Sequence, residues 1–198
     1  DPDFFQRRIA QALDHRRRAG IDETLCRVVW SESDGIPGLI VDRYGAHLCV
    51  QTLTLAMDQR REIIRDALVS TLSPASIVLR NDSPVRKAEG MEPEIGMLHG
   101  DNPGPFSVRA NGLDFEVDPM DGQKTGLYLD QFDNHAAVAT IAAGKRVLDC
   151  FSNQGGFALA CAGAGAGSAP ASTSGSTTAT TTRWARPTTA GRSRSARP

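Results

Sequence analysis

The sequence predicts an α+β module, followed by the beginning of an α/β domain and then by a disordered C-terminal tail. Three observations lead to this expectation. Residues 21–118 contain short β-rich runs, separated by turn sequences, together with an amphipathic helical pattern. Residues 147–161 place a buried strand, a glycine turn and an apolar helix in succession. After Ala162 the amino-acid composition changes abruptly.

The first part of the chain predicts a helix over residues 4–19, because apolar side chains recur at helical spacing until Gly20. The opposite face of this helix is basic and contains Arg7, Arg8, Arg16, Arg17 and Arg18. Such a face is either solvated or in contact with the phosphates of an RNA. The residues alone leave both interpretations open.

Three β-rich runs follow over residues 25–30, 39–44 and 48–53, and turn sequences separate them. They predict an antiparallel meander. A helix is expected over residues 57–72, where one face is apolar, and a further strand over residues 77–80.

The segments FSVRA and LDFEV flank Asn111-Gly112, which is a strong signal for a two-residue β-hairpin. The preceding sequence NDSPVRKAEG is expected to be a loop. Charged side chains gather around it, namely Arg80, Asp82, Arg86 and Glu89. A functional cluster is one interpretation, but we expect a surface ion-pair network.

The next segment is expected to contain a polar loop, a helix, a strand and a second helix, over residues 122–126, 129–142, 147–150 and 157–161. Between the last two lie Gly155 and Gly156, which let a ligand approach the backbone. The helix after them offers unpaired N–H groups at its start. Asp149 is suited either to bind hydroxyl or ammonium groups or to cap the turn. The pattern therefore predicts a site for a nucleotide-like ligand.

The bulk composition excludes several classes of protein. The chain has 198 residues, of which 40% are hydrophobic, and a net charge of -1. No apolar run approaches the roughly 20 residues of a membrane span, and the N-terminus has no signal-peptide core. The four cysteines are widely spaced, so we expect neither disulfides nor a metal site, but buried thiols in the cytoplasm.

Residues 163–198 consist of Ala, Gly, Ser, Thr, Arg and Pro, apart from Trp184. Five arginines give this tail a charge of +5, which leaves 17 Lys and Arg against 23 Asp and Glu before it. A segment with so little apolar surface is expected to be disordered. The abrupt change also favours an off-frame translation of GC-rich DNA over a genuine RNA-binding tail.

Four ordered motifs resemble those of the RlmI-like family, which are class I methyltransferases that use S-adenosyl-L-methionine (SAM) to modify large-subunit ribosomal RNA at cytosine carbon-5. The motifs are SESDGIPGLIVDRYG, RNDSPVRKAEGM, VDPMDGQKTGLYLDQFDNH and VLDCFSNQGGFAL. The resemblance covers about residues 1–162. It implies a linker helix over residues 1–20 after a missing PUA domain, a central α+β domain over 21–118, and the start of a Rossmann-like α/β SAM-methyltransferase domain over 119–162.

The resemblance also implies which residues contact the cofactor. Part of the set matches the segment that covers SAM in the family: Lys124, Thr125, Gly126, Tyr128, Asp130 and Gln131. The rest matches the first SAM-binding motif: Asp149, Phe151, Ser152, Gly155 and Gly156. Ribosomal RNA is the implied partner, a homodimer is allowed, and neither a membrane nor a metal is expected.

The family chemistry requires a cysteine nucleophile, which the resemblance places beyond the first motif, so no catalytic residue is assigned in this chain. The acidic residue that should grip the ribose after the second strand is absent from residues 170–176. We therefore expect an inactive fragment that lacks both ends of the enzyme. Two alternatives remain, an RNA-binding fragment without catalysis and a SAM methyltransferase of the same build that modifies another RNA base or a protein.

Overall fold

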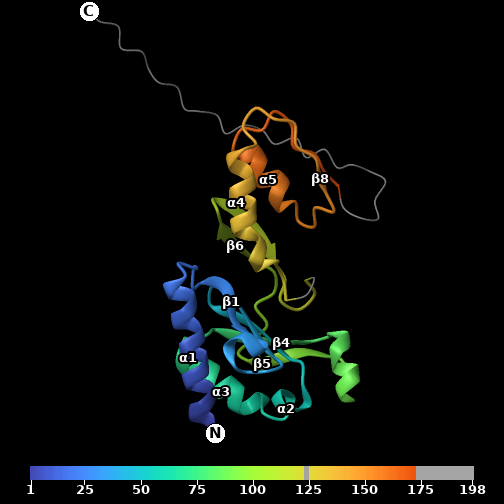
Figure 1. Cartoon of the computed structure of the whole chain (residues 1–198). Helices are drawn as coiled ribbons and strands as arrows, with labels where there is room; N and C mark the ends of the chain where they lie inside the picture. The colour runs from blue at the N-terminus through green and yellow to red at the C-terminus, as the bar shows by residue number, and fades with distance from the viewer. Residues whose placement is uncertain (123–124, 173–198) are drawn as a thin grey trace, which may run out of the picture. The chain divides into compact units, whose positions relative to one another are not determined.

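The computed structural model describes residues 1–122 and 125–172 (Figure 1). The chain divides into two compact units, Asp1–Ala136 and Ala137–Pro198. The predicted boundary between a central domain and a second domain at residue 118 thus lies 18 residues before the division between these units. The predictions for residues 173–198 concern a segment outside the described residues.

The first unit contains a five-stranded mixed sheet in the order β1-β2-β3-β4-β5. Its strands are β1 (Leu25–Trp30), β2 (Leu39–Tyr44), β3 (His47–Thr52), β4 (Ser76–Asn81) and β5 (Glu94–His99). β3 and β4 pair in parallel, and the other neighbours pair antiparallel. The predicted meander is therefore confirmed as β1–β2–β3. A parallel pair needs a crossover, which the helices after β3 supply.

The helices of this unit lie before, between and after these strands. They are α1 (Pro2–Arg18), η1 (Ser31–Asp34), α2 (Leu55–Asp58), α3 (Arg61–Leu72), η2 (Pro84–Glu89) and η3 (Leu129–Gln131). A hairpin of β6 (Phe106–Ala110) and β7 (Leu113–Val117) turns at Asn111 and Gly112, which both have positive φ. The prediction of this hairpin is confirmed.

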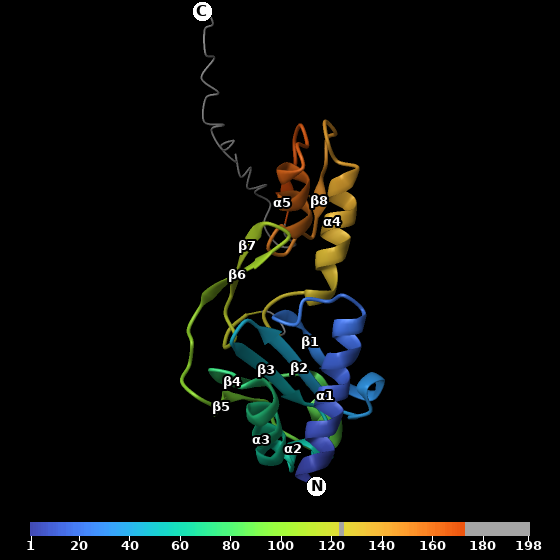
Figure 2. The same cartoon turned by 90° about the vertical axis from the view of Figure 1, so that its left-hand side faces the viewer.

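Both faces of the sheet carry a hydrophobic core. On one face α1 and α3 cover the sheet (Figure 2), and Ile9 and Leu68 pack there against Leu79. On the other face Val78 packs with Phe115 of the hairpin. Because side chains alternate along a strand, neighbouring residues of β4 enter opposite cores, and all six β4 residues are buried. This arrangement explains why the β4 sequence is uniformly apolar at its centre.

Several element predictions need correction. The helix expected over residues 57–72 is broken into α2 and α3, with Thr54 Oγ1 accepting from the Met57 N–H to start α2. β5 was not expected, because its sequence follows a proline and contains Gly96. It forms as an edge strand because β4 offers an unpaired side.

The ion-pair network expected at the surface around residues 80–89 is instead partly buried. Arg80 and Arg86 are 3% and 2% exposed. Arg86 donates to the carboxylate of Asp58 at 2.9 Å and to the carbonyl oxygen of Thr52. Glu89 lies outside this buried group, since its carboxylate accepts from the Leu55 N–H at the surface.

The second unit contains the C-terminal part of α4 (Phe132–Thr140), then β8 (Asp149–Cys150), α5 (Gly156–Gly163) and β9 (Ala171–Ser172). β8 and β9 are parallel, and backbone bonds from the Val147 and Asp149 N–H groups to the Ser168 and Pro170 carbonyls extend the pairing. The prediction of disorder is therefore wrong for residues 163–172, where α5 ends and β9 completes a β–α–β unit.

The buried ion pair of Arg86 predicts a large effect on stability. Arg86→Ala leaves the Asp58 carboxylate and the Thr52 carbonyl without their donor, which should lower the free energy of unfolding by about 3 kcal/mol. Arg109→Ala is the matched control, because the Arg109–Asp114 pair is exposed and should change stability by less than about 1 kcal/mol. Urea denaturation measures both, and similar losses would contradict the prediction.

Candidate functional site

The polar loop at residues 122–126 begins at a buried arginine of the sheet. Arg80 donates to the carbonyl oxygens of Pro119 at 3.0 Å and Gly122 at 2.8 Å. Its guanidinium also pairs with Asp82 at 3.0 Å. Asp118 Oδ1 accepts from the N–H groups of Met120 and Asp121, which closes the turn before the loop. The start of the loop is thus attached to β4.

The end of the same loop is attached to β2. Thr125 donates from its hydroxyl to Asp42 Oδ2 at 2.6 Å, and both side chains are buried. Arg27 donates to both oxygens of the Asp42 carboxylate, at 2.7 and 2.9 Å. The hydroxyl of Tyr44 accepts from the Leu127 N–H at 3.1 Å. Because the Asp42 charge is buried, these donors compensate its desolvation.

Gly126 is required by its position between these contacts. Its φ is +137°, a conformation that other residues rarely adopt. A Cβ atom there would lie 2.9 Å from Val117 Cγ1 and 3.3 Å from the Tyr44 hydroxyl. Backbone conformation and packing therefore explain why residue 126 is a glycine. The resemblance implies a cofactor contact at the same residue.

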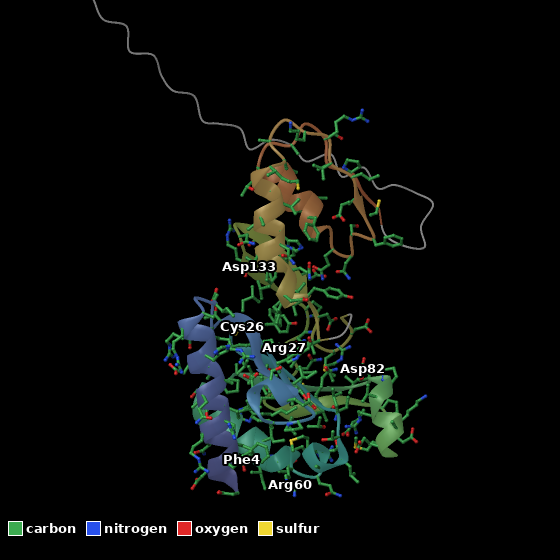
Figure 3. All side chains as sticks on the ribbon, in the orientation of Figure 1. Phe4, Cys26, Arg27, Arg60, Asp82 and Asp133 are labelled. Atoms are coloured by element: carbon green, nitrogen blue, oxygen red, sulfur yellow. The ribbon has the colours of Figure 1, made fainter. Side chains whose placement is uncertain are left out.

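A cleft of about 330 Å³ lies beside the residues that follow the loop, within the first unit. Its apolar walls are formed by Ile21, Leu25, Leu127 and Leu129. Its polar and aromatic residues are Arg16, Arg27, Trp30, Tyr128 and Asp130. Figure 3 labels Cys26 and Arg27, which come from β1 on one side of this cleft. The sequence singled out Tyr128 and Asp130, but not the β1 residues opposite.

Charge at the cleft is held in fixed ion pairs. Arg16 is buried and forms a two-pronged pair with Asp34, and it also donates to the carbonyl oxygen of Arg27 at 2.9 Å. Arg27 lies over the ring of Trp30, with its guanidinium carbon 4.1 Å from the ring centroid. Burial would lower the pKa of the Arg27 guanidinium, but the hydrogen bond to Asp42 and the nearby carboxylates raise it overall. The side chain therefore keeps its charge.

In the second unit, the residues of the first motif surround the start of α5. Asp149 is buried, and its Oδ2 accepts from the Ala158 N–H at 3.1 Å. Asp149 therefore caps the first turn of α5, which is one of the two roles that the sequence left open. The Gly155 φ of +77° and the buried Gly156 bring the chain from the loop into the helix.

The loop between β8 and α5 carries unusual backbone angles. Phe151 and Asn153 have φ of +62° and +50°, although neither is glycine. Phe151 is 79% exposed, and Ser152 is partly exposed. Left-handed non-glycine residues are sparse in proteins and cluster at ligand sites, so the loop is a reasonable candidate for binding.

The structure brings together only part of the predicted set. Thr125, Gly126 and Tyr128 lie in the first unit, with the Gln131 amide donating to the Asp130 carboxylate at 3.3 Å. The first-motif residues lie in the second unit. Lys124 falls outside the described residues. Each group is therefore described within its own unit.

The basic face of α1 is less uniform than the sequence indicates. Arg7, Arg8, Arg17 and Arg18 are exposed. Arg17 pairs with Glu23 at 2.8 Å, and Arg18 pairs with Asp14. Arg16, by contrast, is buried against Asp34 and stabilises the cleft from inside.

The four cysteines differ in accessibility. Burial raises the pKa of Cys26 to about 11, and it also raises the pKa values of Cys49 and Cys161. Cys150 is exposed, so the expectation of four buried thiols is wrong at this position. His135 is buried and stacks against Phe115.

The chain is similar to known methyltransferases. Residues 88–174 match the family model of the S-adenosylmethionine-dependent methyltransferases. A ribosomal RNA large subunit methyltransferase I from Aeromonas salmonicida is 42% identical over 164 residues, which is 80% of this chain. The protein of the same name from Shewanella frigidimarina is 42% identical over 167 residues, or 82% of the chain.

The chain is similar to proteins named ribosomal RNA large subunit methyltransferase I. It spans about two fifths of the length of these curated relatives, 41% and 42% respectively. The resemblance of the four sequence motifs is thereby confirmed.

Solved structures support the fold. A SAM-dependent methyltransferase from Streptococcus mutans matches with a TM-score of 0.71 and 24% identity, over 85% of this chain and 44% of that chain. A methyltransferase solved in complex with SAH matches with the same TM-score and identity, over 85% of this chain and 43% of its own. The predicted combination of an α+β domain with the start of a Rossmann-like domain is therefore confirmed.

Residues 1–122 and 125–172 hold no group of three His, Cys, Asp or Glu residues that could bind a metal ion. None of the described helices combines the length and apolar character that crossing a membrane requires.

The contact between Thr125 and Asp42 predicts a specific loss of stability. Thr125→Val removes a donor from a buried carboxylate and should lower the free energy of unfolding by about 1–3 kcal/mol. Thr125→Ser keeps the hydroxyl and should lower the free energy of unfolding clearly less than Thr125→Val does. Urea denaturation of both variants checks this, and equal losses would show that packing rather than the hydrogen bond matters.

The cysteines predict an order of chemical modification. Iodoacetamide at pH 8 should alkylate Cys150 first, because the other three thiols are buried and their pKa values are raised. Mass spectrometry of peptides after partial reaction measures the order. Cys150→Ser should remove the early adduct, whereas early modification of Cys26 would contradict the structure.

Proposed function

We propose that this chain supplies the central domain and the first β–α–β unit of a SAM-dependent methyltransferase that modifies carbon-5 of a cytosine in 23S ribosomal RNA. One observation carries the proposal: the motifs that resemble the RlmI-like family include residues anchored by buried Arg80 and Asp42, and they include the glycine turn of a parallel β8–α5–β9 unit. Ribosomal RNA as the substrate is supported by the names of relatives that are 42% identical.

The cofactor would contact two segments of the chain. In the second unit, Ser152, Gly155 and Gly156 form the turn into α5, where small residues and helical N–H groups suit a polar ligand. In the first unit, Tyr128 and Asp130 follow the anchored loop. SAM, when bound, supplies the methyl group, and these residues would bind and orient it.

The donor set fits SAM only in part. The glycine turn and the strained loop before it suit close approach of a ligand to the backbone. The end of β9, however, is where related folds place an acidic residue for the ribose hydroxyls, and Pro170, Ala171 and Ser172 provide none. This favours weak cofactor binding by the chain as it stands.

The exposed arginines of α1 support an RNA partner. Arg7, Arg8, Arg17 and Arg18 present positive charge on one helix, and surface pairs such as Arg17–Glu23 are weak enough to exchange for phosphate. The same observation favours the second candidate, an RNA-binding module without catalysis. A methyltransferase that acts on another RNA base or on a protein is the remaining alternative, and the product of methyl transfer distinguishes it.

A ribosomal substrate would place the protein in the cytoplasm. Whether two copies associate is a separate proposal, and the mass measured by light scattering at several concentrations tests a homodimer.

Calorimetry with SAM tests the cofactor proposal. The chain should bind SAM weakly or not at all, because no carboxylate follows β9. Ser172→Asp introduces the missing group and should tighten binding, whereas Ser168→Asp is a control of equal charge. Micromolar binding by the unaltered chain would contradict the argument from the missing acid.

The base specificity requires the gene at its full genomic length. Deleting it should remove one 5-methylcytidine from 23S ribosomal RNA, and mass spectrometry of nuclease fragments locates the nucleotide. An unchanged 23S RNA together with loss of a methyl group elsewhere would favour the alternative of another substrate.

A further inference from the structure

We propose that the cleft between β1 and residues 127–130 binds one nucleotide of the RNA, with its base stacked on Trp30. This inference rests on the proposed function, since that function makes RNA the substrate. It adds a contact for RNA in the first unit.

Trp30 is the first reason. Its side chain is 47% exposed, although tryptophan is among the residues that gain most from burial. It stands at the end of β1, where the Arg27 guanidinium lies 4.1 Å from its ring centroid. That contact orients the indole, and an oriented indole with an accessible surface is a platform on which a nucleobase stacks.

The polar groups of the cleft suit the edge of a base. Asp130 also lines the cleft, but the proposed function assigns its carboxylate to the cofactor, so Arg27 is the group left to contact the base. Arg27 uses Nε and one terminal nitrogen for Asp42, so its Nη1 is not engaged in that pair. The cleft therefore offers a guanidinium donor to the edge of a base.

The size and charge of the cleft favour a nucleotide over a peptide. A volume of about 330 Å³ lies at the lower end of the range for small-ligand sites. Its apolar walls would cover the faces of a base. Arg17 and Arg18 follow Arg16 on the last turn of α1 and are exposed. These two arginines would contact the phosphates on either side.

The cleft also connects to the anchored loop. Arg27 is bound to Asp42, and Asp42 is bound to Thr125. A base on Trp30 therefore lies two side chains from the segment that the sequence motifs assign to the cofactor. RNA binding at Trp30 would therefore affect the loop at Thr125 through the contacts of Arg27 and Asp42.

Binding of a fluorescein-labelled single-stranded oligoribonucleotide tests the proposal. In the Trp184→Phe variant, Trp30 is the remaining tryptophan, and its fluorescence should be quenched as the RNA saturates. Anisotropy should show that Trp30→Ala weakens binding by about 5- to 100-fold, the range for loss of one stacked base. Trp30→Phe keeps an aromatic face and should retain most of the affinity.

Ile95→Ala is the matched control, because Ile95 is 44% exposed and lies on β5, at the opposite edge of the sheet from β1. Its affinity should equal that of the unaltered chain. Undiminished binding by Trp30→Ala, or unquenched Trp30 fluorescence at saturation, would overturn the subsite and leave the proposed function intact. If the unaltered chain binds no RNA, that result would contradict both the proposed subsite and the proposed RNA substrate.

Discussion

The buried carboxylate of Asp42 is the interaction on which the first unit depends most. A charge without exposure to water needs donors, and Asp42 takes them from Arg27 on β1 and Thr125 in the polar loop. These partners are 15 and 83 residues away in the chain. One electrostatic requirement therefore joins the cleft, the sheet and the loop.

Arg80 is a buried cation and needs acceptors, as the buried Asp42 anion needs donors. It is a buried cation whose donors reach the carbonyl oxygens of Pro119 and Gly122. The loop is consequently held before Lys124 by a cation and after it by an anion. Both contacts hold described residues, Pro119 and Gly122 on one side and Thr125 on the other.

Sequence reasoning located the main elements well where the pattern was local. The Asn111-Gly112 hairpin formed as expected, since its turn chemistry is contained in two residues. β5 was missed, because its stability comes from the neighbouring β4. Arg86 was assigned to the surface, because Thr52, whose carbonyl oxygen accepts from it, lies 34 residues away in the chain.

The sequence by itself determined the relationship to ribosomal RNA methyltransferases, the β-rich central module and the glycine turn before α5. These features depend on contiguous motifs and short-range periodicity. Only the tertiary structure decided that Trp30 and Arg27 face Tyr128 and Asp130 across one cleft. Contacts between residues about 100 positions apart are selected by packing and by the compensation of buried charge, which no local pattern records.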